Sequence, residues 1–400
     1  MSPRRAPPPR PEVDRSALMH TYAEPAVTFV RGQGTVLYDD QGRRYLDFIG
    51  GLAVTSLGHA HPDVAAAISA QASTLLHVSN LYGNELGPEV AATIDRLVGG
   101  GSRRGGGQVF FANSGAEANE CALKLARRVG GPGRHVVVSA LGSFHGRTLA
   151  TLTATGQPEK HEPFRPLPEG FVHVPYDDLA AVEGALVAEP VAAVLLEPIL
   201  GEGGVITPSS DYLSGVRELC TEHGALLVLD EIQTGLGRTG RWFSFQHADL
   251  APDVVTLAKA LGNGVPVGAC WARAEVAAAF GPGDHGSTFG GQPLAMAAAR
   301  ATLAVMEAEG VCARAERAGH RLGDGLAGLD GVVAVRGQGL LLAAQIDGDR
   351  ARDVAARALG LGLLVNAVRP DAVRLAPPLL VADDEIDEAL AILADALGTV

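Results

Sequence analysis

The sequence predicts an α/β protein whose central sheet is mostly parallel and is covered by helices on both faces. Apolar residues make up 47% of the 400 residues, which is enough for a large buried core. Between residues 108 and 272, apolar runs of strand length alternate with segments of helical periodicity, as they do in βαβ units. The apolar runs lack polar alternation, which is typical of strands that are buried on both faces.

The first part of the chain is predicted to be a tail followed by short strands. Residues 1–16 are rich in proline and arginine without an apolar segment, so we expect a disordered tail rather than a secretory signal. Short strands are expected over residues 28–51, where glycine-containing turn signals separate apolar stretches. A helix is expected over residues 61–77, because Pro62 suits a first helical turn. Residues 17–75 are predicted to be the N-terminal segment of a small domain.

A large domain is predicted for residues 76–291. Its helices are expected at 114–128 and 210–224, where apolar residues recur with helical spacing. Its strands are expected at the apolar runs 108–113, 135–140, 192–198, 225–231, 253–259 and 267–272. Because parallel strands need crossover connections, most of these runs are expected to be joined by helices on the faces of the sheet.

Residues 292–400 are predicted to complete the small domain. The pattern changes near residue 292 to a long Ala-rich helix. After this helix we expect, in order, strands within 332–346, a helix near 350–360, strands within 365–379 and a closing helix near 383–397. This mixture indicates a second, smaller α/β unit formed by the N- and C-terminal segments.

The composition excludes several classes of function. The formal net charge is −13 and there is no basic block in the body of the chain, so nucleic acid is not expected as a partner. The longest apolar runs are about half of what a membrane span needs. The four cysteines are far apart, which indicates neither a disulfide framework nor a thiolate zinc site and favours a cytoplasmic location. His59 and His61 have no third ligand at suitable spacing, so no metal is expected.

The segment GLGRTG at residues 235–240 matches the dinucleotide fingerprint G-x-G-x-x-G. The fingerprint works when the first glycine closes a strand and the third opens a helix. Here the preceding strand ends several residues earlier, and the following residues are too rich in aromatic residues, Asp and Pro for a crossover helix. We therefore interpret the match as accidental.

Polar residues that directly follow apolar runs indicate a different cofactor. In such sheets ligands bind at the carboxyl ends of the strands, where Glu197, Asp230 and Lys259 are expected. Burial there would lower the pKa of Lys259, and a neutral amine can form a Schiff base with an aldehyde. A solvated lysine at a strand end is the simpler alternative. The segment that begins the helix at 114–128 is, taken alone, an ordinary helix start, with Ser or Asn as the cap and Glu117 in the first turn.

Pyridoxal phosphate requires more than a lysine, and each of its requirements has a candidate. It needs a carboxylate for the pyridine nitrogen, an anion site for the phosphate and an aromatic face for the ring. Asp230 could supply the carboxylate, and Phe144 or His145 could stack on the ring. The start of the helix at 114–128 could bind the phosphate through its free N–H groups and its dipole.

The sequence resembles the class III pyridoxal-phosphate aminotransferases from about Tyr22 to the C-terminus. Within this class it is most similar to the acetylornithine aminotransferases. The resemblance implies a fold-type I transferase that acts as a homodimer with active sites shared between subunits. The motifs that carry it are LDFIGGLAVTSLGHAHP, FFANSGAEANE, SFHGRT, EPILGEGG, LLVLDEIQTGLGRTG, TLAKALGNG, HGSTFGGQP and RLAPPL.

The resemblance also implies roles for individual residues. Lys259 would attach the cofactor and move the proton, Asp230 would pair with the pyridinium nitrogen and Gln233 would reach the phenolic oxygen. Ser287 and Thr288 would come from the partner subunit, with Thr288 on the phosphate. The full set implied to bind the cofactor is Ser114, Gly115, Ala116, Phe144, His145, Asp230, Glu231, Ile232, Gln233, Lys259 and Thr288.

The implied substrate site contains two arginines. Arg147 would bind the α-carboxylate of the amino donor, and Arg374 would bind that of glutamate. Glu202 would pair with Arg374 when no carboxylate is there, so that one site could take both substrates. Ser287 is also placed at the substrate, and Tyr22 is a candidate contact for the far end of the donor.

The implied reaction moves the δ-amino group of N2-acetyl-L-ornithine to 2-oxoglutarate by a ping-pong mechanism. Ornithine, succinylornithine and 4-aminobutyrate remain alternative donors, an aminomutase or racemase is an alternative reaction, and a non-catalytic cofactor-binding protein is a third alternative. Asn263 stands where a third glycine is usual in the family, and Gln292 stands where Asn is common. Both departures bear on the geometry of loops near the site.

Overall fold

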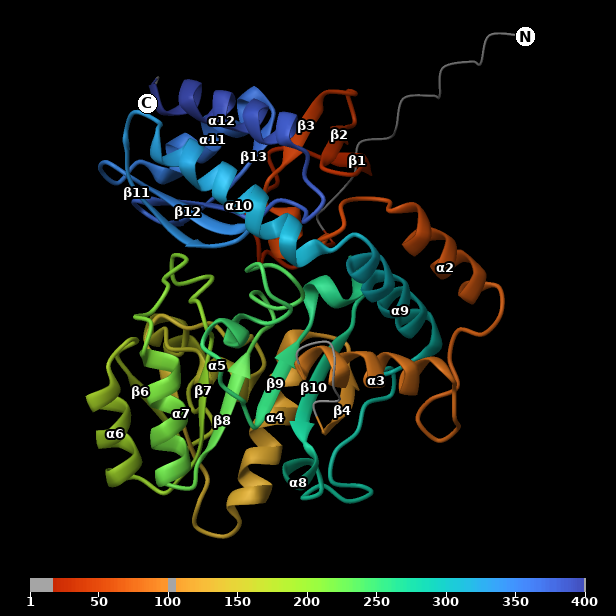
Figure 1. Cartoon of the computed structure of the whole chain (residues 1–400), viewed down its shortest axis with the longest axis vertical. Helices are drawn as coiled ribbons and strands as arrows, with labels where there is room; N and C mark the ends of the chain where they lie inside the picture. The colour runs from red at the N-terminus through yellow and green to blue at the C-terminus, as the bar shows by residue number, and fades with distance from the viewer. Residues whose placement is uncertain (1–16, 100–105, 399–400) are drawn as a thin grey trace.

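A seven-stranded sheet lies at the centre of the larger, lower part of the molecule in Figure 1. The computed structural model describes residues 17–99 and 106–398, so the tail predicted at 1–16 lies outside the described residues. The order of the sheet is β4 (Gly107–Ala112), β10 (Gly268–Arg273), β9 (Val254–Leu257), β8 (Leu226–Asp230), β7 (Val191–Leu196), β5 (Val136–Ala140) and β6 (Phe171–Val174). The ladders β5–β6, β5–β7, β7–β8 and β8–β9 are parallel, whereas β10 runs antiparallel to both of its neighbours, which confirms a mostly parallel sheet.

Helices cover both faces of this sheet, because the side chains of its strands alternate between two apolar cores. In β8, Leu227 and Leu229 belong to the core of one face, and Leu226 and Val228 belong to the core of the other. A period of two along a strand produces this alternation and makes both faces apolar. The first core includes residues of α6 (Leu179–Ala188) and α7 (Tyr212–Glu222), and the second includes residues of α4 (Gly115–Gly130).

The smaller, upper part of the molecule combines both ends of the described chain. Strand β13 (Leu363–Leu364) pairs in parallel with β3 (Arg44–Asp47), which joins a C-terminal strand to the N-terminal sheet. That sheet has the order β1 (Phe29–Gln33), β2 (Val36–Asp39), β3, β13. An antiparallel sheet has the order β11 (Val332–Gln338), β12 (Leu341–Ile346), β15 (Ala372–Leu375), β14 (Asn366–Arg369), and the helices of this part are α10 (Val311–Ala327), α11 (Ala351–Leu361) and α12 (Asp383–Gly398).

Further helices connect the two parts or lie at the edges of the large sheet. The α-helices of this group are α1 (Gly50–Ala53), α2 (Pro62–Ala72), α3 (Leu86–Val98), α5 (Leu149–Ala154), α8 (Ala274–Ala277) and α9 (Pro293–Ala308). Helices α2 and α9 pack against each other, and α9 also packs against α3 (Figure 1). The 3₁₀ turns are η1 (Pro158–Lys160), η2 (Glu162–Phe164), η3 (Ser244–His247) and η4 (Lys259–Gly262).

The sequence prediction was wrong for some elements. The single Ala-rich helix expected from residue 292 is two helices, α9 and α10, because Gly310 between them adopts a left-handed φ of 58° that ends helical geometry. Helix α3, strand β6 and helix α6 were not predicted at all. Strand β6 is a four-residue edge strand that contains His173, and α6 has a single charged residue, Glu183, among apolar and small residues, so neither shows clear periodicity.

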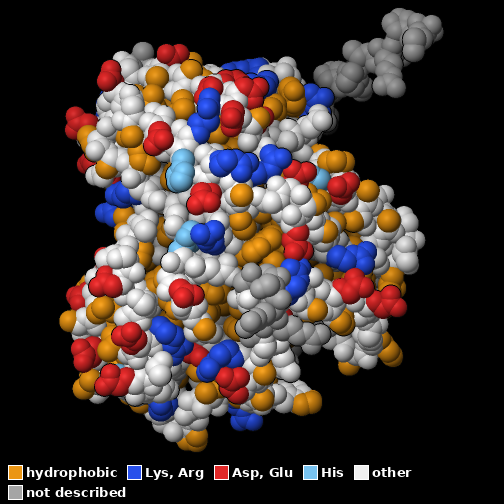
Figure 2. All heavy atoms as spheres, viewed as in Figure 1, with side chains coloured by type: hydrophobic (Ala, Val, Ile, Leu, Met, Phe, Trp, Pro, Cys, Tyr) orange, Lys and Arg blue, Asp and Glu red, His pale blue; other side chains and the backbone are white. Residues whose placement is uncertain are grey.

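Two further features concern the charges on the surface and the length and apolar character of the helices. Acidic and basic side chains are interspersed over the face drawn in Figure 2. In the part of the chain that the structure describes, none of the helices combines the length and the apolar character needed to cross a membrane.

Arg238, in the GLGRTG segment, joins the two parts of the molecule. This segment forms successive turns rather than the start of a crossover helix. Arg238 is 2% exposed and donates hydrogen bonds to Leu340 O at 3.0 Å, Pro377 O at 2.6 Å and Ser56 Oγ at 3.0 Å. Burial lowers the pKa of Arg238 to about 9. One guanidinium group therefore links three segments that are distant in the sequence.

Replacement of Arg238 with Met should lower the thermal unfolding temperature by several degrees. The substitution leaves two carbonyl oxygens and a hydroxyl without their donor, and each unsatisfied buried group costs about 1–3 kcal/mol. Arg241→Met is the matched control, since Arg241 lies close by in the chain and is exposed. Calorimetric melting of the two variants measures the difference, and equal melting temperatures would contradict the role given to Arg238.

Candidate active site

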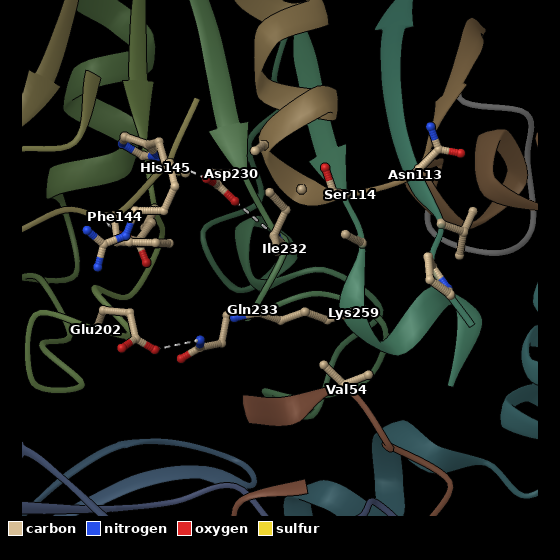
Figure 3. Close-up of a pocket in the computed structure, with 18 of the residues that line it drawn as sticks. Val54, Asn113, Ser114, Phe144, His145, Glu202, Asp230, Ile232, Gln233 and Lys259 are labelled. Carbon is tan, nitrogen blue, oxygen red and sulfur yellow. Dashed lines mark hydrogen bonds and ion pairs between the residues drawn. The ribbon is translucent and has the colours of Figure 1, made fainter. Parts of the chain in front are cut away.

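A cavity of about 460 Å³ lies at the carboxyl ends of the central strands (Figure 3). It collects residues that the sequence separates by more than a hundred positions. Its walls come from the start of α4, from the loop after β5, from the loop after β7 and from the ends of β8 and β9. The predicted residues that line it include Ser114, Phe144, Glu202, Asp230, Gln233 and Lys259.

Lys259 follows β9 and begins the turn η4. Its φ of 44° lies in the left-handed region, which costs a non-glycine residue about 1–3 kcal/mol and is found mostly at functional positions. Burial lowers the pKa of Lys259 to about 8, and the nearby Glu202 carboxylate opposes this effect. An appreciable fraction of the amine is therefore neutral near physiological pH. Figure 3 shows this side chain extending into the cavity toward the side that carries Gln233.

Asp230 ends β8 and is 3% exposed, yet its carboxylate is well hydrogen-bonded. Asn119 Nδ2 donates to Asp230 Oδ2 at 2.8 Å, His145 Nδ1 lies 2.8 Å from the same oxygen, and Ile232 N donates to Oδ1 at 3.1 Å. Asn119 is itself fixed by Thr256, whose hydroxyl donates to Asn119 Oδ1 at 2.7 Å. These contacts satisfy both oxygens of a buried carboxylate that faces the cavity.

The first turn of α4 forms an anion site. Ser114 caps the helix by accepting from Glu117 N, so its side chain has a structural function as well. Within the described part of the chain, the N–H groups of Gly115 and Ala116 have no acceptor. A side chain at Gly115 would place its Cβ 2.7 Å from Ile232 Cδ1, so the Ile232 side chain would have to shift. Both free N–H groups belong to residues that line the cavity.

Phe144 and Arg147 form one wall. Phe144 N donates to Glu197 Oε1 at 2.8 Å, which fixes the backbone that carries the ring. The guanidinium carbon of Arg147 lies 5.5 Å from the centre of the Phe144 ring. Among the residues that the structure describes, Arg147 has no ion-pair partner. A cation on the cavity wall is thus available to an anionic ligand.

Arg374 occupies a buried position beside Glu202 and Gln233. Arg374 Nη1 lies 2.5 Å from Glu202 Oε1 and 3.1 Å from Gln233 Oε1, and its Nε donates to Asn366 Oδ1 at 3.2 Å. Burial is the largest single influence on Glu202 and raises its pKa, but the charge and hydrogen bond of Arg374, together with the charge of Lys259 and the hydrogen bond from Gln233, outweigh it and hold this pKa below its ordinary value. Arg374 Nη2 is buried without a partner in the described chain. The guanidinium can therefore accept another anion.

Five residues that the resemblance implicates do not line this cavity, and one of them is Arg374, which lies behind the lining residues Glu202 and Gln233. Ser287 and Thr288 line a second cavity of about 340 Å³, which shares Asn113 with the first. Tyr22 is 91% exposed. The Glu231 carboxylate accepts from Thr234 and from Phe245 N, so its contacts are with the protein around the cavity.

Asn119 had no role in the sequence prediction, and Glu197 was expected at the ligand edge of the sheet but was given no function of its own. Asn119 lies inside the predicted helix, where only the three-dimensional fold brings it to Asp230. Glu197 lines the cavity, accepts from Phe144 N and Gly201 N, and burial raises its pKa to about 7. Its place directly after an apolar strand was the signal, because polar residues there reach the ligand edge of the sheet.

The two departures from the family pattern have structural explanations. Asn263 adopts a left-handed φ of 45°, which Asn tolerates better than most residues, and its side chain bonds Leu57 N at 2.8 Å and Gly58 O at 3.2 Å. Gln292 caps α9, since its Oε1 accepts from Leu294 N at 3.0 Å. Both residues thus stabilise the local backbone.

This set of groups fits pyridoxal phosphate. Lys259 offers a buried amine to an aldehyde, and Asp230 offers a carboxylate to a pyridine nitrogen. Gly115 and Ala116 offer free N–H groups to a phosphate at a helix N-terminus. Phe144 offers an aromatic face, and buried His145 Nε2 has no partner within the described residues.

Comparisons with known proteins agree with this chemistry. The chain matches the family model "Aminotransferase class-III" over residues 18–397. It is 47% identical over 385 residues to an acetylornithine aminotransferase of Corynebacterium efficiens, with 95% of each chain covered, and 49% identical over 385 residues to one of Gloeobacter violaceus, with 94% of each covered.

Solved structures give the same result. The ornithine aminotransferase from Toxoplasma gondii matches with a TM-score of 0.90 and 36% identity over 96% of this chain and 93% of that one. The N-acetylornithine aminotransferase from Stenotrophomonas maltophilia matches with a TM-score of 0.81 and 37% identity over 95% and 97%. The chain therefore belongs to the class III aminotransferases and is an enzyme that depends on pyridoxal phosphate.

Proposed function

We propose that this enzyme transfers the δ-amino group of N2-acetyl-L-ornithine to 2-oxoglutarate, a step of arginine biosynthesis. The observation that carries the proposal is the pair of arginines around Lys259. Arg147 has no ion-pair partner in the described chain, whereas Arg374 is paired with Glu202 at 2.5 Å. One cation is thus free for the carboxylate of a donor that reacts at its δ-amine, and the other is masked.

The names of the relatives support this choice. Relatives from Corynebacterium efficiens and Gloeobacter violaceus, at 47% and 49% identity, are acetylornithine aminotransferases. Charge supports it as well, because an acylated α-nitrogen is neutral. The α-ammonium group of free ornithine would add a positive charge close to Arg147.

The chain's own residues divide the chemistry between them. Pyridoxal phosphate, when bound, supplies an aldehyde that joins an amine and a ring that withdraws electrons from the neighbouring carbon. Lys259, partly neutral because of its lowered pKa, removes a proton from the reacting carbon of the substrate and returns it. Asp230 keeps a proton on the pyridine nitrogen, and Asn119 and His145 orient the carboxylate.

The two half-reactions need different anion sites. In the first, Arg147 binds the α-carboxylate of N2-acetyl-L-ornithine and Glu202 stays on Arg374. In the second, the α-carboxylate of 2-oxoglutarate displaces Glu202 from Arg374. Exchange of partners on one guanidinium lets a single cavity present either a δ-amine or an α-carbon to Lys259.

We further propose a cytoplasmic homodimer in which Ser287 and Thr288 reach the partner's site. Their position in a second cavity, away from Lys259, supports a function in the other subunit. Exposed apolar side chains are found in the same region, including Leu81, Tyr82 and Phe289. The proposed division of the chain is a small domain from 17–75 and 292–400 and a large domain from 76–291.

Ornithine is the second candidate donor. The observation that favours it is the match to ornithine aminotransferase from Toxoplasma gondii at a TM-score of 0.90, above the 0.81 of the N-acetylornithine enzyme from Stenotrophomonas maltophilia.

Steady-state rates with 2-oxoglutarate and each donor test the proposal. N2-acetyl-L-ornithine should have the highest kcat/KM, ahead of ornithine, succinylornithine and 4-aminobutyrate, because a neutral acylated nitrogen fits beside Arg147. A higher kcat/KM for ornithine would shift the assignment to the second candidate. Turnover without 2-oxoglutarate would point to an aminomutase.

The attachment of the cofactor can be located directly, because the chain contains three lysines: Lys124, Lys160 and Lys259. Borohydride reduction followed by peptide mass spectrometry should find the pyridoxyl label on Lys259 alone. Lys259→Ala should lose both the label and measurable transamination. As a control, Lys124→Ala should keep the label on Lys259. A label on another lysine would contradict the site.

Glu202→Gln should lower the KM for 2-oxoglutarate. Without the carboxylate, the incoming ligand no longer competes with a charged partner for Arg374. In single half-reactions followed by stopped-flow spectroscopy, the same change should raise the rate of the cofactor-loaded enzyme with glutamate relative to its rate with N2-acetyl-L-ornithine. Glu159→Gln is the control, since Glu159 is exposed. An unchanged ratio would show that Glu202 does not mask Arg374.

A further inference from the structure

Two cations lie against one aromatic ring on the cavity wall. The guanidinium carbon of Arg147 is 5.5 Å from the centre of the Phe144 ring, and Lys160 Nζ is 5.6 Å from it. Both distances allow a cation–π attraction. Within the described residues, neither side chain forms an ion pair with an acid. Phe144 and Arg147 line the cavity and Lys160 lies against the same ring, so two positive charges without a negative partner meet at this ring.

Lys160 is held in this position by hydrogen bonds. Its ammonium group donates to Gln157 Oε1, and Gln157 Nε2 donates to Ser143 O at 2.9 Å. Ser143 directly precedes Phe144 in the chain. The turn η1, in which Lys160 N donates to Gln157 O at 2.9 Å, fixes the backbone. Lys160 therefore has a defined place relative to the ring rather than a free position in solvent.

The electrostatics of the pair favour an anionic ligand. Burial lowers the pKa of Lys160, the charge of Arg147 lowers it further, and Glu159 and Glu202 oppose these effects. Glu202 cannot neutralise the pair, because it lies 2.5 Å from Arg374 Nη1. An anion bound between Arg147 and Lys160 would remove the repulsion between two like charges.

We propose that Arg147 and Lys160 form a two-cation subsite for the carboxylate that lies far from the reacting carbon, with Lys160 as a specificity-determining residue. This inference rests on the proposed function. The ligand would be the α-carboxylate of the acylated donor in one half-reaction and the distal carboxylate of 2-oxoglutarate in the other. The planar guanidinium favours one carboxylate orientation, whereas the flexible ammonium can follow a carboxylate whose position differs between the two substrates.

The subsite also selects against cationic groups. A diamine that carries an ammonium in place of the carboxylate would meet two positive charges. Lys160 is therefore expected to influence the discrimination between anionic and cationic substrates as well as the affinity for a single anionic substrate.

Glutarate is a suitable probe, because it has two carboxylates and neither an amine nor an oxo group. Its Kd for the cofactor-loaded enzyme can be measured by isothermal titration calorimetry at low and high salt. Lys160→Gln should raise the Kd about 10-fold at low salt, the factor that corresponds to the loss of one charge-assisted contact. The difference should shrink at high salt, because the site is partly exposed. Lys160→Arg should keep the Kd close to that of the wild type.

The matched control is Arg165→Gln, which removes a cation from the same segment. Arg165 is exposed and pairs with Glu162 at 3.0 Å. Equal glutarate affinities in Lys160→Gln and Arg165→Gln would overturn the proposal, as would a wild-type enzyme that does not bind glutarate. So would a Lys160→Gln enzyme in which kcat falls while the Kd for glutarate is unchanged, since that indicates a structural role.

Steady-state kinetics separate the subsite from the choice of donor. Lys160→Gln should raise the KM for 2-oxoglutarate and leave kcat within about twofold, and Lys160→Arg should restore the KM. If another donor replaces N2-acetyl-L-ornithine while glutarate binding still depends on Lys160, the proposed function fails and the subsite stands. If N2-acetyl-L-ornithine is the preferred donor while glutarate binding does not depend on Lys160, the proposed function stands and the subsite fails.

Discussion

The buried carboxylate of Asp230 is the constraint on which the rest of the site depends. A buried charge is tolerated when hydrogen bonds satisfy it, and here the donors come from Asn119, His145 and Ile232 N. Asn119 belongs to α4, whose first turn forms the anion site, and His145 directly follows Phe144. The hydrogen bonds that stabilise one acid therefore also position the phosphate end and the aromatic wall of the cavity.

Much of the site could be predicted from the order of the strands. Because β8 and β9 are parallel neighbours, Asp230 and Lys259 had to reach the same edge of the sheet. The partner of Asp230 within α4, Asn119, could not be predicted, since helical spacing does not tell which buried polar residue meets a strand end. The break at Gly310 was missed for a related reason: the Ala-rich pattern continues on both sides of a single glycine, and propensity alone does not distinguish one helix from two.

Two buried arginines solve the same physical problem in different ways. Arg238 is neutralised by no acid in the described chain and is held by carbonyl oxygens and a hydroxyl from three segments, so its partners are fixed by the fold. Arg374 is held by Glu202, whose side chain is 31% exposed, and by the amides of Gln233 and Asn366. A partly exposed carboxylate can leave at a smaller cost than a buried one. Arg238 thus keeps fixed partners that link three segments, whereas Arg374 is placed to exchange its anion in the proposed reaction.

The proposed exchange of anions on Arg374 also bears on Lys259. Arg374 lowers the pKa of Lys259 and Glu202 raises it, so the paired ions largely cancel and burial is the main reason for a pKa of about 8. When a substrate carboxylate takes the place of Glu202, the charge next to Arg374 is unchanged in sign and magnitude. The amine therefore meets a similar electrostatic environment with either substrate. One lysine can then move protons in both half-reactions although the substrates differ in length and in the atom that reacts.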